Sequence, residues 1–213
     1  MWYNGGMDGQ EYLDRISASN RKPTQGHGSR ILGSKFFWVG AIGIGVFILI
    51  AIIGAILRSS GGGEKSQCLE LLAHIEYTSE MIDEYQPSIK SSDLRSSSAS
   101  FYSVLTNTDN GLQDYVATKY KVKDIKKSLS QKTQKTIEAE RDALNEDLFK
   151  AKINGILDRT YADKMAYELS LIMAQEENIS DATRDDALME ILDSSYNSLK
   201  NLYDKFNNFS EAR

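Results

Sequence analysis

The feature that most constrains this chain is an uninterrupted apolar run over residues 36–57, in which every side chain is apolar or is that of glycine. At about 1.5 Å per residue this run makes a helix of about 33 Å, long enough to cross a hydrocarbon core of about 30 Å. A single span in lipid must be helical, because only a helix satisfies all of its own backbone hydrogen bonds. We therefore predict one transmembrane helix over residues 36–57.

Basic residues indicate the orientation of this span. Those before it are Arg15, Arg21, Lys22, Arg30 and Lys35, whereas only Arg58 and Lys65 follow closely. Because cytoplasmic flanks carry the excess of basic residues, the N-terminus is predicted to be cytoplasmic and the C-terminal domain extracytoplasmic. A cleaved secretory signal is the alternative, but its apolar core should be only about 7 to 15 residues long and close to the N-terminus. An uncleaved signal anchor in the cell membrane is therefore favoured.

The rest of the chain of 213 residues divides into three further parts. Residues 1–35 contain few aliphatic side chains and are predicted to be a disordered cytoplasmic tail. Residues 58–65 are rich in serine and glycine, which is typical of a flexible linker. Residues 66–213 are long enough for one domain with a substantial core.

Helical periodicity dominates this C-terminal domain. A first helix is predicted from residue 64 to residue 86, where Pro87 ends it. A second helix begins near Ser92 or Asp93, with turn-prone residues 107–111 as a point where it would kink or split. Its apolar face follows an alternating four- and three-residue spacing, which suits the seam of a bundle. The residues on that face are Leu94, Ser98, Phe101, Leu105, Thr108, Leu112 and Tyr115.

The last third of the chain continues the same pattern. A third helix, opening at Asp124, has few apolar side chains in its middle turns and is expected to be the least buried. Gly155 ends or bends it, and Asp158 is a candidate cap for the next helix; one long bent helix is the alternative. Ser180 or Asp181 is expected to cap the last helix. The sequence thus predicts an all-α fold, in which one transmembrane helix precedes an extracytoplasmic antiparallel bundle of four or five helices.

Catalytic signatures are missing from the sequence. His74 is the only histidine of the predicted outer domain, and no Glu-x-x-His pattern of a di-iron bundle accompanies it. We interpret His74 and Glu70 as an exposed pair on a helix surface. The adjacent carboxylates Glu176 and Glu177 are interpreted as solvated charges. No enzyme activity, metal site or cofactor is expected.

A cluster of lysines between the second and third predicted helices, the basic segment, is the candidate binding site. Its members are Lys119, Lys121, Lys123, Lys126, Lys127, Lys132 and Lys135. Such a segment would contact anionic head-groups, an anionic wall polymer or an acidic partner protein. The alternative is a solvated face whose lysines pair with acids on neighbouring helices. The overall net charge of −5 argues against nucleic-acid binding.

Two features bear on self-association. Cys68 is the single cysteine, so it would either form a disulfide with a second copy of the chain or pack as a small apolar residue. Ala41 and Gly45 have the small-xxx-small spacing that lets two membrane helices approach closely, as in a homodimer.

The expected function is that of a single-pass, membrane-anchored helical module that binds or organises another component of the cell envelope. An extracytoplasmic sensor of a small ligand, or an accessory subunit that signals through a separate membrane partner, is the alternative. The predicted outer domain resembles extracellular four-helix sensor domains in outline only.

Overall fold

The computed structural model of the chain describes residues 63–209. The predicted tail, the predicted transmembrane helix over residues 36–57 and most of the predicted linker lie outside these residues. Between residues 63 and 209, no helix is both long enough and apolar enough to cross a membrane. This part of the chain consists of helices and short connections, with no strand, so its predicted all-α class is confirmed.

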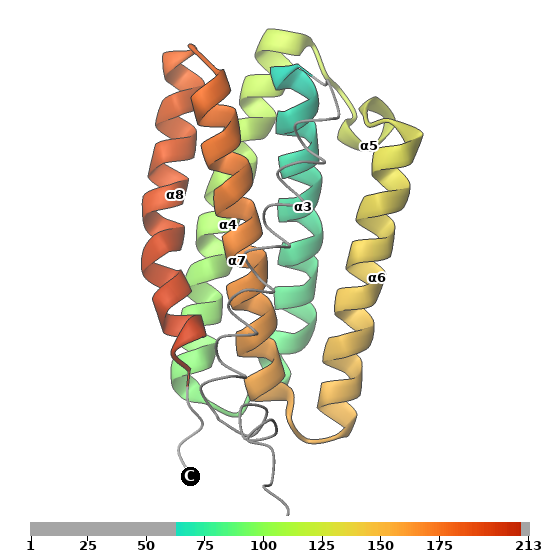
Figure 1. Cartoon of the computed structure of the whole chain (residues 1–213), viewed down its shortest axis with the longest axis vertical. Coiled ribbons are helices and arrows are strands. Elements are labelled where there is room, and N and C mark those ends of the chain that lie inside the picture. The colour runs from blue at the N-terminus through green and yellow to red at the C-terminus, as the bar shows by residue number, and fades with distance from the viewer. Residues whose placement is uncertain (1–62, 210–213) are drawn as a thin grey trace, which may run out of the picture. The chain divides into compact units, whose positions relative to one another are not determined.

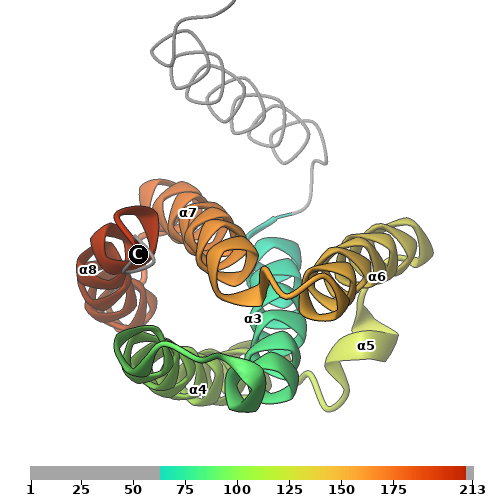
Figure 2. The ribbon, with the colours of Figure 1, turned by 90° about the horizontal axis from the view of Figure 1, so that it is seen from below.

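Four long helices surround a shared core, and a fifth lies outside it (Figures 1 and 2). In chain order the elements are α3 (Glu64–Tyr85), the 3₁₀ helix η1 (Gln86–Ser88), α4 (Ser92–Tyr120), α5 (Ile125–Ser128), α6 (Gln131–Ile153), α7 (Leu157–Ala182) and α8 (Asp186–Asn207). Around the core the order is α3, α4, α8, α7, with each helix antiparallel to its neighbours. Helix α6 packs on α3 and α7 from outside the bundle.

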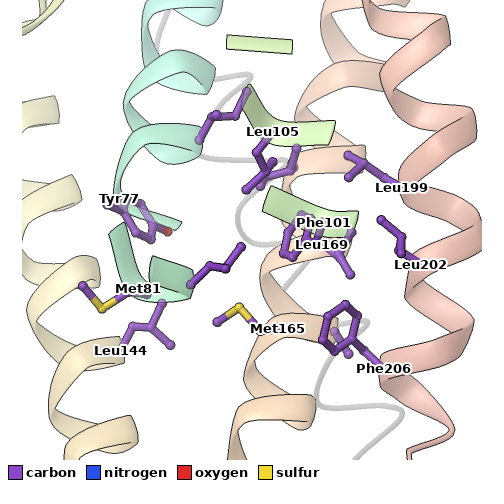
Figure 3. Packing of buried hydrophobic residues seen from close by; sticks show 14 of the residues in the cluster. Tyr77, Met81, Phe101, Leu105, Leu144, Met165, Leu169, Leu199, Leu202 and Phe206 are labelled. Carbon is purple, nitrogen blue, oxygen red and sulfur yellow. The ribbon is translucent and has the colours of Figure 1, made fainter. Parts of the chain in front are cut away.

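The predicted seam of α4 packs in the core, as does the buried face of α8. On α4 every predicted seam residue is buried except Tyr115, which is half-buried beside the buried Val116. On α8 the buried residues are Leu188, Leu192, Ser195, Leu199, Leu202 and Phe206. Aromatic rings fill the lower part of the core, where Phe101 of α4 meets Phe206 of α8 edge to face, with ring centroids 5.9 Å apart (Figure 3). Such pairs add to the stability that burial of the rings provides.

Helix α6 is the least buried of the long helices, as predicted. Only Leu144, Leu148 and Ala151 of this helix are buried. A helix with so narrow an apolar stripe cannot fill a position in the core, so it covers one side of the bundle instead. Gly155, with φ of +73°, lies in the connection between α6 and α7, so the two are not one bent helix.

Some helix boundaries differ from the prediction. Asp124 caps only the single turn α5, and the long helix α6 begins later, with Ser130 as its cap. Helix α7 continues through Ser180 and Asp181, so neither caps α8; Asp185 does so through its side chain. In each case another serine or aspartate within a few residues made the backbone hydrogen bonds, and the sequence contained several equivalent candidates.

Asp158 does not cap α7, whose N-cap residue is Ile156. The Asp158 carboxylate instead accepts hydrogen bonds from the backbone N–H groups of Lys90 and Ser91, at 2.7 to 3.1 Å. It therefore satisfies backbone donors at the start of α4, 67 residues away in sequence for the shorter contact. A tertiary contact of this kind leaves no local pattern in the sequence.

Helix α4 is continuous through residues 107–111, where a kink or break was predicted. Gly111 lies against Ile191 of α8, and a Cβ atom at this glycine would come within 3.3 Å of the Ile191 side chain. The glycine therefore serves the close packing of α4 and α8 rather than a turn. Packing against a neighbouring helix offsets the low helix propensity of these residues.

At the end of the bundle where α3 begins, Glu64 of α3 contacts the end of α4 and the connection between α7 and α8. Its Oε1 atom lies 2.7 Å from Lys119 Nζ and 2.6 Å from the Tyr115 hydroxyl, and Thr183 donates to Oε2 at 2.8 Å. Tyr120 also donates to Glu64. Burial by itself would raise the pKa of Glu64, but these hydrogen bonds outweigh it and lower the pKa to about 2.

We expect Glu64→Gln to lower the free energy of unfolding at pH 7 by about 1–3 kcal/mol, the usual range for hydrogen bonds to a charged group. A depressed carboxyl pKa contributes stability above the unfolded value of 4.5, and this contribution is lost as pH falls toward 2. The difference between wild type and variant should therefore shrink below pH 4.5. This difference is measured by urea unfolding of the full chain in detergent at several pH values, with circular dichroism as the signal. Glu84→Gln, at an exposed position of the same helix, is the control. An equal loss of unfolding free energy in that variant would contradict the stabilising role of the Glu64 hydrogen bonds.

Candidate functional site

The basic segment separates into two groups in the structure. Lys119 belongs to the Glu64 network and also contacts Asp185 Oδ2 at 2.9 Å. Lys126 pairs with Glu76 of α3 at 2.9 Å, and Lys127 pairs with Asp124 at 3.1 Å. These three lysines are partly or wholly neutralised by nearby carboxylates. These contacts agree with the alternative of a solvated face whose lysines pair with neighbouring acids, and the binding role of these three lysines stays a prediction.

The other four lysines of the segment are exposed, and among residues 63–209 none of them has a carboxylate within ion-pair distance. They are Lys121, Lys123, Lys132 and Lys135, and we call them the basic surface. Lys121 ends α4 in the left-handed conformation, with φ of 55°. Lys123 lies in the connection to α5, whereas Lys132 and Lys135 are in the first two turns of α6.

The backbone beneath the basic surface is held in place by local contacts. Asp124 accepts a hydrogen bond from the Lys127 N–H, and Ser130 accepts one from the Thr133 N–H, so both helix starts are capped. The Gln134 side chain donates to carbonyl groups of α5, at 2.7 Å for Lys126 and 3.0 Å for Leu129. These contacts fix α5 relative to the start of α6, so the four lysines are presented on an ordered backbone.

An apolar contact fastens this segment to the bundle. Leu129, which is 9% exposed, packs in a small cluster with Leu69 and Ala73 of α3. Helix α5 therefore lies beside the upper half of α3, at the end of the bundle where α3 begins and α4 ends (Figure 1). The basic surface consequently occupies the same end as Glu64.

The opposite side of that end is acidic. Where α7 and α8 meet, which we call the α7–α8 turn, Asp181 lies in the last turn of α7, Asp185 in the connection and Asp186 at the start of α8; Asp181 and Asp186 are exposed. Arg184 is an exposed base in the same turn. The end of the bundle therefore has a basic side over α5 and α6 and a mainly acidic side over the α7–α8 turn.

His74 is buried, so its interpretation as an exposed partner of Glu70 is wrong. Its Nε2 atom lies 2.7 Å from Glu168 Oε2, and its Nδ1 atom lies 3.0 Å from the Gln175 side-chain oxygen. The Tyr77 hydroxyl donates to the same Glu168 oxygen at 3.0 Å, and the Tyr77 ring stacks on the imidazole. Burial and the neighbouring Glu168 carboxylate raise the Tyr77 pKa. The network connects α3 with α7.

Glu176 is also buried, at 1% exposure, so its interpretation as a solvated charge is wrong, whereas Glu177 is exposed. Neither carboxyl oxygen of Glu176 has a hydrogen-bond partner among the described residues. Burial raises the pKa of Glu176 to about 8, although the nearby Ser195 hydroxyl opposes the shift. The spacing contained the signal: Glu176 follows Ile172 by four residues and precedes Ile179 by three, which places it on the buried face.

Cys68 is fully buried, and burial raises the pKa of its thiol to about 12. A protonated, enclosed thiol reacts slowly. A disulfide with a second copy would require this part of α3 to open, so that idea stays a prediction. The residue packs in the core as a small apolar side chain.

Metal ligands and hollows of the surface are two further kinds of candidate site. Within residues 63–209 there is no group of three or more histidine, cysteine, aspartate or glutamate residues placed to hold a metal ion. A hollow of about 1170 Å³ lies at the end of the bundle away from the basic surface, where α4 and α7 begin and α8 ends. Polar side chains such as Ser96, Ser97, Asp158 and Lys205 line it.

Comparisons with protein-family models, with curated proteins and with solved structures give no match. The geometry and chemistry of the described residues are therefore the basis for the functional proposal.

We expect the buried Glu176 to make stability depend on pH. The folded state holds its proton up to about pH 8, whereas the unfolded state releases it near 4.5, so the free energy of unfolding should fall as pH rises between these values. The slope approaches about 1.4 kcal/mol per pH unit. Glu176→Gln should remove this slope and be more stable than wild type at pH 8.

The control for this experiment is Glu177→Gln, the same change at the adjacent exposed position. Chemical denaturation of the full chain in detergent at pH 5, 6.5 and 8 measures both variants. A slope that persists in Glu176→Gln would show that another group is responsible.

Proposed function

We propose that this protein is a non-enzymatic, single-pass membrane-anchored module whose helical domain binds an anionic component of the cell envelope through the basic surface. The observation that supports this proposal is the separation of the lysines into two groups. Four of them are exposed on a capped, ordered backbone and have no carboxylate of residues 63–209 within ion-pair distance, although the chain as a whole is acidic. Exposed charges that internal carboxylates do not neutralise remain available to attract a partner of opposite charge.

The predicted anchor at residues 36–57 determines where the proposed module would lie in the cell. With the N-terminus in the cytoplasm, the helical domain would lie outside it and would stay close to the bilayer through the short linker. A module of this kind acts by contact and by local concentration, so it needs neither a cofactor nor a catalytic group.

Charge reversal tests the proposal. We expect Lys→Glu changes at all four residues of the basic surface to remove the crosslinked products that wild type forms in intact cells, because the attraction becomes repulsion. The control reverses four exposed lysines elsewhere on the bundle: Lys90, Lys152, Lys200 and Lys205. Three of these line the hollow described above, so a change confined to the control would point to the hollow instead. Crosslinking followed by affinity capture and mass spectrometry compares the three proteins. An identical set of products from all three would contradict a binding role for the basic surface.

A second candidate function is the binding of a small polar ligand, as in a sensor. The observation that favours it is the hollow of about 1170 Å³ at the other end of the bundle, which is lined by serines and by charges of both signs. Such a volume is large enough for a metabolite. Its position between the starts of α4 and α7 would allow a ligand to couple these two helices.

For this candidate, we expect at least one metabolite in a thermal-shift screen of the full chain to raise the melting temperature, because a ligand of the folded state stabilises it. Ser96→Trp, which places a bulky ring in the hollow, should abolish the shift. Ser103→Trp, at an exposed position of α4 outside the hollow, should preserve it. A shift that is equal in both variants would exclude the hollow as the binding site.

A further inference from the structure

The position of the basic surface relative to the predicted anchor points to its binding partner. Only residues 58–62 separate the end of the predicted transmembrane helix from Gly63, the first described residue. Six fully extended residue steps reach at most about 22 Å. The end of the bundle where α3 begins must therefore stay within about that distance of the bilayer if the anchor spans it.

The basic surface lies at this same end. Lys119, two residues before Lys121, contacts Glu64 at the first turn of α3, and α5 packs against α3 close to its start. The far end of the bundle is about 33 Å away along α3. Exposed charges separated by more than about 10 Å are largely screened at physiological salt, so the end that the anchor holds near the bilayer is the one best placed to respond to charged lipid.

We propose that the basic surface docks on the anionic lipid head-groups of the bilayer in which the chain is anchored. This inference rests on the proposed function and assigns the bilayer itself as its partner. Four lysines on one ordered segment provide the multiple weak contacts by which basic segments bind anionic lipid. Because the anchor keeps these lysines near the head-groups, contacts that would be weak in solution are sufficient.

The charge distribution at this end also determines an orientation. The exposed Asp181 and Asp186 of the α7–α8 turn would be repelled by the same head-groups. The bundle should therefore lean with α5 and the start of α6 toward the lipid and with the α7–α8 turn away from it. An acidic partner protein would impose no such relation to the bilayer, so the orientation distinguishes the two partners.

Hydrogen–deuterium exchange of the full chain in nanodiscs tests the inference. One set of discs contains only phosphatidylcholine, and the other contains about one-third phosphatidylglycerol. We expect backbone amides of residues 121–135 to exchange at least about fivefold more slowly in the anionic discs, because docked head-groups restrict local opening. Residues 183–186 should exchange equally in both, which provides an internal control. Raising the salt to about 0.5 M should remove the difference.

Two sets of variants make this result specific. Changing the four lysines of the basic surface to Gln, or to Glu, should abolish the slowing, whereas the same changes at Lys90, Lys152, Lys200 and Lys205 should leave it intact. The Gln variants guard against local unfolding caused by charge reversal, and circular dichroism verifies the helical content of each protein.

Equal exchange in the two kinds of disc would overturn the inference, as would slowing that extends to the α7–α8 turn. Slower amide exchange that requires an added acidic protein would also overturn docking on lipid. It would leave the proposed function in place, with that protein as the partner. Failure of the full chain to incorporate into discs would instead contradict the membrane anchor, and with it the proposed function. The two failures are therefore distinguishable within this experiment.

Discussion

The apolar seam shared by α3, α4, α7 and α8 is the constraint on which the rest of the structure depends. Each of these helices carries enough buried side chains to occupy a corner of the core, and Phe101 and Phe206 meet across it. Helix α6 buries only three residues and is therefore excluded to the outside. This exclusion leaves α5 and the first turns of α6 at the edge of the bundle, where only Ile125 and Ile137 pack against the core. The first two turns of α6 carry Lys132 and Lys135, two of the four lysines of the basic surface, so the composition of α6 determines both its place in the fold and the exposure of these two lysines.

Polar groups inside the bundle are treated in two different ways. Glu168 is satisfied by His74 and Tyr77, which gives the contact between α3 and α7 a directional component beyond apolar packing. Glu176 has no hydrogen-bond partner among the described residues, and its burial is tolerated because the carboxyl group holds its proton. A buried group of this kind reduces stability as pH rises. We have no physical account of why the chain retains a carboxyl group at this position.

The candidate site illustrates how far sequence reasoning reaches. The run of lysines was visible in the sequence, and so was the choice between a binding segment and a solvated face. The structure shows that Lys119 and Lys126 meet carboxylates that lie more than forty residues away in the chain, whereas the binding role of the other lysines is a proposal. No local pattern reveals such partners. The same limit explains Asp158, which binds backbone groups at the start of α4 rather than capping its own helix.

The sequence by itself determined the helical class of the described residues, the spacing of the buried seam on α4, and the weak burial of α6, because these follow from local periodicity. It also carries the prediction of a membrane anchor, which lies outside the described residues. Only the tertiary structure decided that His74 and Glu176 are buried, which serine or aspartate caps each helix, and which lysines meet a carboxylate. These outcomes depend on groups that are distant in sequence and adjacent in space, so the folded arrangement alone selects among the alternatives.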